Sequence, residues 1–419
     1  MTAQTKLTNA VLWSPDLPEP LDGADILVEG GLIADIVPAG TGGAAETVID
    51  CDGRWVIPGM IDSHMHSWGA RSSNPVHWVV GQSPLSWFRA VGDLRRILEA
   101  GFTTVREAGG PLGPGLRDAI NEGEITGPRV FPAHLGISRT GGHGDCHSLP
   151  ISWVTEQPYM ARIADGADEV RTAVRAAARD GGEWVKIWAS GAIALSDNDS
   201  PEHLHFSVEE LEVICREAHA LGMTVGAHVE FPSAIKACVL AGVDVIEHGF
   251  ILDEETCLLM AKRQVPVVST MALLHRYLRW DGPEITQAQV DLARELLPSV
   301  HASALLAYRS GVTVAIGSDS FAEPLTPFGA NAEELLALHE AGLPAVACLE
   351  AATINGAKVM GKEKQLGSVT VGKIADLIVT GRTSPLDDLN TVVGADKITL
   401  VLRDGVPVAG TGLRRTLSL

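Results

Sequence analysis

The sequence predicts an α/β protein with a (β/α)8 TIM barrel and a small β-sandwich domain built from both chain ends. Three observations lead to this prediction. The chain has 419 residues, more than one compact core usually serves. Its middle alternates short apolar runs with stretches of helical periodicity, a pattern typical of a parallel barrel. Its two ends consist of short strands separated by tight turns.

The two ends have the pattern of antiparallel hairpins. Residues 24–31 and 32–37 are predicted to form a strand and its return strand, and residues 398–408 form two strands around an Asp-Gly turn. We therefore assign residues 1–57 to the N-terminal part of the sandwich and residues 366–419 to its C-terminal part. Residues 58–365 then form the barrel.

Eight apolar runs in the middle of the chain are typical of strands that are buried on both faces. They are residues 55–61, 103–106, 129–133, 184–189, 224–229, 243–248, 266–270 and 313–317. Between them lie helical signals, such as the capping box of Ser207 and Glu210, which predicts a helix ending at Ala220. An open doubly wound sheet would also suit this alternation, but the glycine-rich fingerprint expected at its first turn is missing.

Composition and charge exclude several functions. A net charge of −20 disfavours nucleic-acid binding, which needs a basic surface. No apolar run is long enough to span a bilayer, and the N-terminus lacks the pattern of a signal peptide. The 6 cysteines contain no C-x-x-C pair, which indicates reduced thiols. We expect a cytoplasmic enzyme with a small-molecule substrate and no membrane or nucleic-acid partner, and a homo-oligomer stays an open alternative.

The first candidate for chemistry is the pair His64 and His66. Residues i and i+2 of a strand project to the same side, so both imidazoles can face one metal ion. An H-x-H pair is common by chance. This one ends the first predicted barrel strand, where such barrels place their active sites, and its position therefore favours a metal site.

Lys186 lies within an otherwise apolar predicted strand, Trp184-Val185-Lys186-Ile187-Trp188. A lysine usually buries its stem and extends its ammonium to water, but a barrel interior offers little route to bulk solvent. An unpaired buried ammonium is costly. The position therefore indicates a lowered pKa with chemical modification, or a direct part in chemistry.

Three further candidates lie at strand ends. His228 and His248 end two successive predicted strands, and Asp319 follows the last one. A single histidine of this kind can be an ordinary core residue, and the aspartate can cap the following helix. Two histidines at equivalent positions are more typical of metal ligands.

The order H-x-H on strand one, Lys on strand four, His on strands five and six and Asp on strand eight resembles the binuclear amidohydrolase superfamily. Linking segments resemble its imidazolonepropionase-like branch, which includes Xaa-Pro dipeptidases, carboxypeptidase-like enzymes and ochratoxin-type amidases. The resemblance runs from about residue 24 to residue 408. The segments that carry it are 101–107, 127–130, 140–145 and 367–377.

The resemblance implies two divalent metal ions and an N6-carboxylysine at Lys186 that bridges them. One ion would be held by His64, His66 and Asp319, the other by His228 and His248. Histidine and carboxylate ligands suit Zn²⁺, with Mn²⁺ or Co²⁺ as alternatives.

The activity that the resemblance implies is hydrolysis of a C–N bond, in an amide or peptide-like substrate, by a hydroxide shared between the metals. Asp319 would pass a proton to the leaving nitrogen. His143, in the glycine-rich loop 141–144, is the candidate to stabilise the oxyanion, and an ordinary loop-stabilising role is the alternative.

Other activities on the same fold stay open: a cyclic amidohydrolase, a metal-dependent decarboxylase, a mononuclear deaminase or a catalytically inactive binding protein. Glu230 lies two residues after His228 and resembles the glutamate that mononuclear deaminases of this superfamily use as a proton shuttle. Their spacing is usually one residue longer, however, and they use no lysine on strand four.

The substrate is expected to be apolar or aromatic. Trp68, Trp78, Trp87 and Phe88 crowd the segment after strand one and are candidates for an apolar pocket. Trp68, His143 and Arg139 are the predicted substrate-binding residues. Whether Arg71 or Arg139 binds a substrate carboxylate, or both are surface arginines, is left open.

Overall fold

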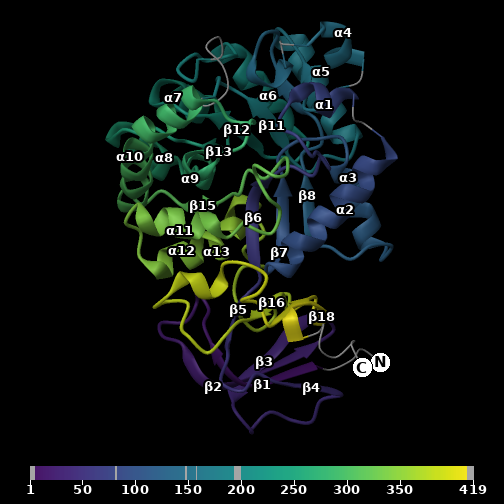
Figure 1. Ribbon diagram of the computed structural model, residues 1–419, viewed down its shortest axis with the longest axis vertical. Helices are drawn as coiled ribbons and strands as arrows, with labels where there is room; N and C mark the ends of the chain where they lie inside the picture. Colours follow the sequence, from purple (N-terminus) through teal and green to yellow (C-terminus); the bar gives the residue numbers. More distant parts are fainter. Residues whose placement is uncertain (1–4, 81–82, 147–148, 157, 193–199, 413–419) are drawn as a thin grey trace.

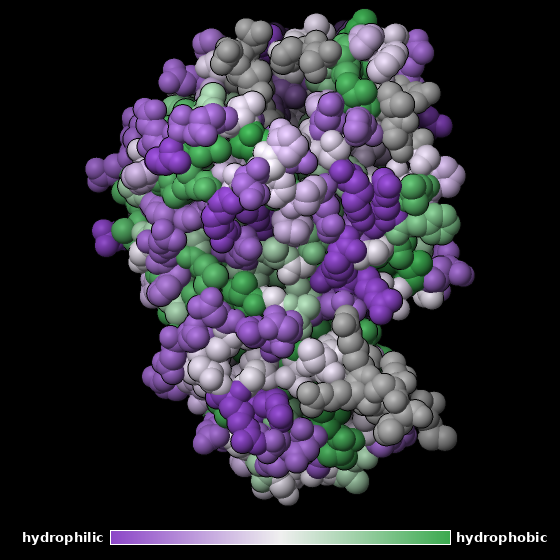
Figure 2. Space-filling model, viewed as in Figure 1, coloured by the Kyte–Doolittle hydropathy of each residue, from purple (hydrophilic) through white to green (hydrophobic). Residues whose placement is uncertain are grey.

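The computed structural model describes residues 5–80, 83–146, 149–156, 158–192 and 200–412. It has two parts (Figure 1): a large barrel and a smaller strand-rich part that contains both ends of the described chain. The face shown in Figure 2 is mainly hydrophilic, with apolar residues scattered over it in small groups. The predicted fold class is confirmed.

The strand-rich part is a sheet in the order β18-β17-β16-β5-β1-β2-β3, with β4 beside β1. Strand β5 joins the two chain ends, because it pairs in parallel with β1 and antiparallel with β16. Buried side chains from several strands of this sheet form one apolar core, which includes Leu7, Ile26, Val56 and Leu402. The strands are β1 (Thr5–Leu12), β2 (Leu21–Glu29), β3 (Leu32–Pro38), β4 (Thr47–Asp50), β5 (Trp55–Pro58), β16 (Leu377–Val379), β17 (Leu400–Arg403) and β18 (Val406–Ala409).

The barrel strands run parallel in two hydrogen-bonded groups, β6-β7-β8 and β11-β12-β13-β14-β15. Short strands β9 (Gly136–Ser138) and β10 (Ala161–Ile163) extend the second group beyond β11. The eight strands are β6 (Met60–Met65), β7 (Phe102–Glu107), β8 (Arg129–Pro132), β11 (Val185–Trp188), β12 (Val225–Val229), β13 (Val245–His248), β14 (Val267–Ser269) and β15 (Val314–Ile316).

Backbone hydrogen bonds join the two groups into a closed barrel. On one side, the Glu183 N–H donates to the Pro132 carbonyl over 2.8 Å. On the other, the Asp319 N–H donates to the His64 carbonyl and the His66 N–H to the Ser320 carbonyl, each over 2.8 Å. The barrel therefore closes through the backbone of three predicted site residues.

The prediction of a single first strand over 55–61 is wrong. This run is divided between two sheets: β5 ends at Pro58 in the terminal sheet, and β6 begins at Met60 in the barrel. Proline has no N–H to donate to a ladder. A Cβ on Gly59 would lie 2.2 Å from Oγ1 of Thr103, so only glycine fits where the chain crosses between the sheets.

Helices surround the barrel (Figure 1). Helix α6 begins with the predicted capping box, in which Ser207 accepts a hydrogen bond from the Glu210 N–H, and it ends at Ala220 as expected. None of the described helices is long and apolar enough to cross a membrane. The helices are α1 (Pro75–Val80), α2 (Pro84–Glu99), α3 (Gly113–Asn121), α4 (Ile151–Glu156), α5 (Ala167–Arg179), α6 (Val208–Ala220), α7 (Pro232–Ala241), α8 (Glu254–Arg263), α9 (Ala272–Arg279), α10 (Gln287–Arg309), α11 (Glu333–Glu340), α12 (Ala345–Ala351) and α13 (Ile354–Val359), with 3-10 turns η1 (His143–Asp145) and η2 (Leu389–Val392).

The barrel interior contains a buried ion pair. Nη1 of Arg106, on β7, lies 2.6 Å from Oε1 of Glu247, on β13. The Arg106 guanidinium also stacks on Trp184, 3.3 Å from its ring centroid. A Cβ on Gly226, in β12, would lie 2.5 Å from both charged groups, so glycine leaves the space that the pair occupies.

We expect Gly226→Ala to lower the free energy of unfolding by about 1–3 kcal/mol, because the added methyl group overpacks this interior. Gly92→Ala is the matched control. Gly92 lies within α2, where the new Cβ would be 3.9 Å from Nη1 of Arg96, at the end of a flexible side chain, and alanine there should stabilise the protein by about 0.5–1 kcal/mol. Denaturant unfolding of both variants measures the difference. Equal effects would mean that the interior accommodates the methyl group.

Candidate functional site

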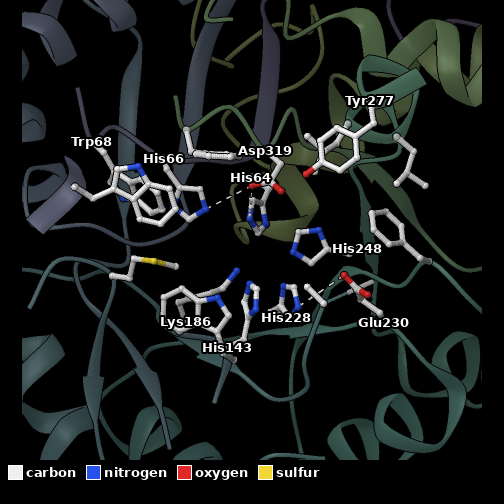
Figure 3. A pocket seen from close by; sticks show the side chains of 18 residues that line it. His64, His66, Trp68, His143, Lys186, His228, Glu230, His248, Tyr277 and Asp319 are labelled. Carbon is white, nitrogen blue, oxygen red and sulfur yellow. Dashed lines mark ion pairs between the residues drawn. The ribbon is translucent and has the colours of Figure 1, made fainter. Parts of the chain in front are cut away.

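The predicted metal-binding side chains meet in one cavity at the carboxyl ends of the barrel strands (Figure 3). They come from β6, β11, β12 and β13 and from the turns that follow β6 and β15. In Figure 3 their polar atoms converge on a central gap, which Lys186 and Asp319 face from opposite sides. The six residues are His64, His66, Lys186, His228, His248 and Asp319.

Asp319 and the H-x-H pair form the tightest group. Oδ1 of Asp319 lies 3.5 Å from Nε2 of His64 and 3.5 Å from Nε2 of His66. One ligand atom of each residue lies within 4.8 Å of the others, a spacing that suits a metal ion. Burial acts to raise the pKa of Asp319, but the hydrogen bond from His66 and the neighbouring imidazoles outweigh it and hold that pKa well below its usual value.

The backbone is strained at two of these positions. Asp319 has a φ of +47° and His248 a φ of +71°, both in the left-handed region that residues other than glycine rarely adopt. Such conformations persist where surrounding contacts impose them, and they cluster at functional sites.

Three histidines are oriented through Nδ1. Nδ1 of His64 lies 2.7 Å from Oε2 of Glu247, Nδ1 of His66 lies 2.8 Å from the Gly109 carbonyl oxygen, and Nδ1 of His248 lies 2.8 Å from Oγ1 of Thr270. With Nδ1 engaged, Nε2 of each ring is left for the cavity. Partners of this kind fix the tautomer and direction of metal-binding imidazoles.

His228 has the opposite orientation: its Nε2 lies 3.3 Å from the Gly191 carbonyl oxygen, which leaves Nδ1 for the cavity. Its ring lies 4.5 Å from that of His248, centroid to centroid. Burial lowers the pKa of His64 and His228 well below the ordinary value and that of His248 to about 4. All three are therefore neutral imidazoles near pH 7, the form that binds metal.

Lys186 is 1% exposed and points into the same cavity. Within the described residues its ammonium makes no hydrogen bond or ion pair, and it lies 5.5 Å from the centroid of the Trp188 ring. Burial lowers the pKa of Lys186 to about 8. The buried amine thus lies beside four imidazoles and a carboxylate, side chains of the kind that bind divalent metal ions.

His143 and Glu230 also line the cavity. The His143 ring stacks on that of His228, with centroids 4.7 Å apart and planes at 12°. Oε1 of Glu230 lies 3.8 Å from Nε2 of His228. His143 is therefore placed where it can reach a ligand, whereas Glu230 lies on the side of His228 that faces away from its Nδ1.

Of the four aromatic residues predicted to form the pocket, two line the cavity and two do not. Trp68 and Trp78 line the cavity, and Nε1 of Trp68 donates to the Gly109 carbonyl over 2.6 Å. Trp87 and Phe88 lie on α2, 42% and 74% exposed, and take no part in the cavity wall. The helical phase of α2 turns them to solvent.

Neither arginine considered for substrate binding is part of the described cavity wall. Arg71 forms two hydrogen bonds to the Asp93 carboxylate, at 2.8 and 3.1 Å. Arg139 follows β9 in a half-buried position.

Much of the apolar wall was not predicted. Trp188 could have been found, because it lies two residues after Lys186 in the same strand and so projects to the same side. Leu273, Leu274 and Tyr277 come from α9, and nothing in their local pattern sets them apart from ordinary core residues.

Comparisons with known proteins show similarity over most of the chain. The profile described as "Amidohydrolase family" matches residues 55–408. The ochratoxinase of Aspergillus niger is 30% identical over 374 residues, which cover 85% of this chain and 76% of that protein. Its crystal structure matches with a TM-score of 0.88 at 28% identity, over 98% of this chain and 96% of that one.

Two further crystal structures are similar over almost their whole length. A prolidase in complex with N-methylphosphonate-L-proline has a TM-score of 0.89 at 30% identity, over 97% of this chain and 100% of that chain. A Xaa-Pro dipeptidase with bound methionine has a TM-score of 0.85 at 29% identity, with the same coverage of both chains.

We expect Glu247→Gln to lower the free energy of unfolding by about 3–5 kcal/mol, since it leaves the Arg106 guanidinium buried without a counter-ion. Denaturant unfolding of the metal-free protein measures this loss. Adding Arg106→Met to the variant should restore part of it. Glu46→Gln, at an exposed position, serves as the control and should change stability by less than about 0.5 kcal/mol. A Glu247→Gln protein as stable as the control would contradict the role of the pair.

Proposed function

Because the chain belongs to the amidohydrolase family, and to the branch that the sequence suggested, it is a hydrolase of C–N bonds, and we propose that it is a binuclear metalloenzyme. Its substrate would be a small amide or peptide-like molecule with an apolar or aromatic group. In this proposal Zn²⁺ is the first candidate metal. His64, His66 and Asp319 would hold one ion, His228 and His248 would hold the second, and carboxylated Lys186 would be a ligand to both.

The observation that carries this proposal is the position of Lys186. Its buried amine faces the gap between the two groups of imidazoles, where a cation would repel any metal ion. Attack of the neutral amine on carbon dioxide forms an N–C bond and releases one proton. The side chain thereby becomes a carbamate, whose single negative charge is shared by two oxygen atoms, so that one oxygen would be available to each of two divalent ions.

When bound, two divalent ions supply a hydroxide nucleophile at neutral pH and polarise the scissile carbonyl. Asp319 accepts the proton of the attacking water and delivers it to the leaving nitrogen, which breaks the C–N bond. Its carboxylate faces the cavity from the turn after β15, next to the imidazoles that hold it ionised. His143 donates a hydrogen bond to the carbonyl oxygen as negative charge develops there.

The walls of the cavity support an apolar or aromatic substrate. They carry Trp68, Trp78, Phe250, Tyr277 and Phe321. Ligand pockets lined mainly by aromatic and apolar side chains, with a few polar groups that converge on one point, suit a small organic molecule. Among the described lining residues Lys186 is the sole lysine or arginine, which disfavours recognition of a substrate carboxylate by an arginine.

A mononuclear deaminase that uses Glu230 is the second candidate, since Glu230 lies in the same cavity. It would need one metal ion and would not depend on Lys186. A metal-dependent decarboxylase would release carbon dioxide in place of an amine. Metal content and product analysis separate these activities from the proposed one.

We expect about two tightly bound metal ions per chain in the wild type and at most one in Lys186→Ala, whose activity should fall at least about 100-fold. Metal analysis is paired with a screen of N-acyl amino acids, dipeptides, arylamides and cyclic amides. Added formate or acetate should restore part of the lost activity, because a small carboxylate can occupy the place of the carbamate. Lys364→Ala, at an exposed position, is the control. One ion per chain in both proteins, unaffected by Lys186→Ala, would reject the binuclear site.

For the most active substrate of that screen, His143→Leu should lower kcat about 100-fold or more, as expected for loss of an oxyanion donor, because leucine has no N–H to donate. Its metal content should equal that of the wild type, because His143 stacks on His228 without entering the proposed ligand set. A large rise in KM at unchanged kcat would instead assign His143 to substrate binding.

A further inference from the structure

A second group of possible metal-binding side chains lies outside the cavity. His275 on α9, His301 on α10 and Glu340 at the end of α11 come together where these three helices pack against one another. The two Nε2 atoms of the histidines are 3.1 Å apart, and Nδ1 of His275 lies 3.9 Å from Oε2 of Glu340. One ligand atom of each residue lies within 4.8 Å of the others.

The spacing of the two imidazoles suits a shared ion. Two Zn–N bonds of about 2.0–2.1 Å at a tetrahedral angle place the nitrogens roughly 3.3 Å apart. The 3.1 Å separation also suits a hydrogen bond between the rings, which an ion would replace. The rings are nearly parallel, with centroids 5.2 Å apart and planes at 24°.

The surroundings keep the two imidazoles available. Burial lowers the pKa of His275, although Glu340 acts in the opposite direction, and burial also lowers the pKa of His301. Both rings are therefore mainly neutral at pH 7, and each then has one unprotonated ring nitrogen that can bind an ion once the hydrogen bond between the rings is broken. The Glu340 side chain is 65% exposed, so it can rotate to contribute a carboxylate oxygen at little cost.

The position of α9 gives such an ion a structural consequence. Leu273, Leu274 and Tyr277 of α9 line the cavity, whereas His275 of the same helix faces α10. Arg276 donates to the carbonyl of Ser318, directly before Asp319. A metal ion bound on the α10 side of α9 would restrict the motion of this helix. It would thereby also restrict the cavity wall and the turn that carries Asp319.

We propose that His275, His301 and Glu340 form a separate divalent-metal site, suited to Zn²⁺ with water completing its coordination, that fastens α9 to α10 and α11. Three protein ligands and an open position make it weaker than a closed four-ligand structural site. It is independent of the cavity residues and would exist whether or not the cavity binds two metals.

The test counts zinc ions bound per chain. Wild type, His301→Ala, Glu340→Ala and His77→Ala are each dialysed to equilibrium against a series of buffered free Zn²⁺ concentrations, and bound zinc is measured by elemental analysis. We expect His301→Ala to bind one equivalent fewer than the wild type. Glu340→Ala should bind that equivalent about tenfold more weakly. His77→Ala, which changes an exposed histidine of α1, should match the wild type.

A second readout is independent of stoichiometry. With the tighter sites already filled, further Zn²⁺ should raise the thermal unfolding midpoint of the wild type and of His77→Ala by a few degrees, and should leave that of His301→Ala unchanged. Glu340→Ala keeps the test informative if His301→Ala folds poorly, because Glu340 is exposed. Equal zinc stoichiometry and equal thermal shifts in all four proteins would overturn the proposal.

Discussion

The arrangement of the barrel interior depends on one buried ion pair, between Arg106 and Glu247. Glu247 uses one carboxylate oxygen for Arg106 and the other for Nδ1 of His64. The pair therefore links three strands, β7, β13 and β6, and sets the direction of an imidazole at the cavity. A charge pair in an apolar interior is costly unless its geometry is good and its remaining hydrogen bonds are made. Here Trp184 stacks on the guanidinium, and Gly226 has no side chain that would collide with the pair. The neighbouring residues are therefore of the kinds that the buried pair requires.

The polar side chains of the cavity were predictable because strand geometry is local. A residue at the end of a buried strand lies at the active face of a barrel wherever the strand falls in the sequence. His64, His228 and His248 could thus be placed without knowing any contact between them. Their orienting partners could not be found in this way. Gly109, Thr270 and Glu247 reach the rings through pairings between neighbouring strands or across the barrel, which no local pattern records.

The predictions that failed did so for tertiary reasons. Residues 55–61 form one continuous apolar run, and an apolar run does not indicate which sheet its residues join. Pro58 and Gly59 were the local signs of a break. Trp87 and Phe88 were grouped with Trp68 because they are near in sequence, but both lie on a 16-residue helix, α2, that turns their rings toward the surface. The α9 wall of the cavity has the same composition as the core, and its role follows from where the helix lies.

Because the chain passes from the terminal sheet into the barrel at Gly59, assembly of the site depends on segments that are synthesised late. Strand β6, which carries His64, continues directly from β5, and β5 pairs with β1 on one side and with β16 on the other. During synthesis the first imidazole therefore emerges early, but the strand that supports it gains its second neighbour only after residue 377 has left the ribosome. Closure of the barrel through the Asp319 backbone also waits for the last third of the chain. The nascent protein thus carries His64 and His66 while the remaining barrel strands are synthesised, before these two side chains are held in place, and the complete site is a late product of folding.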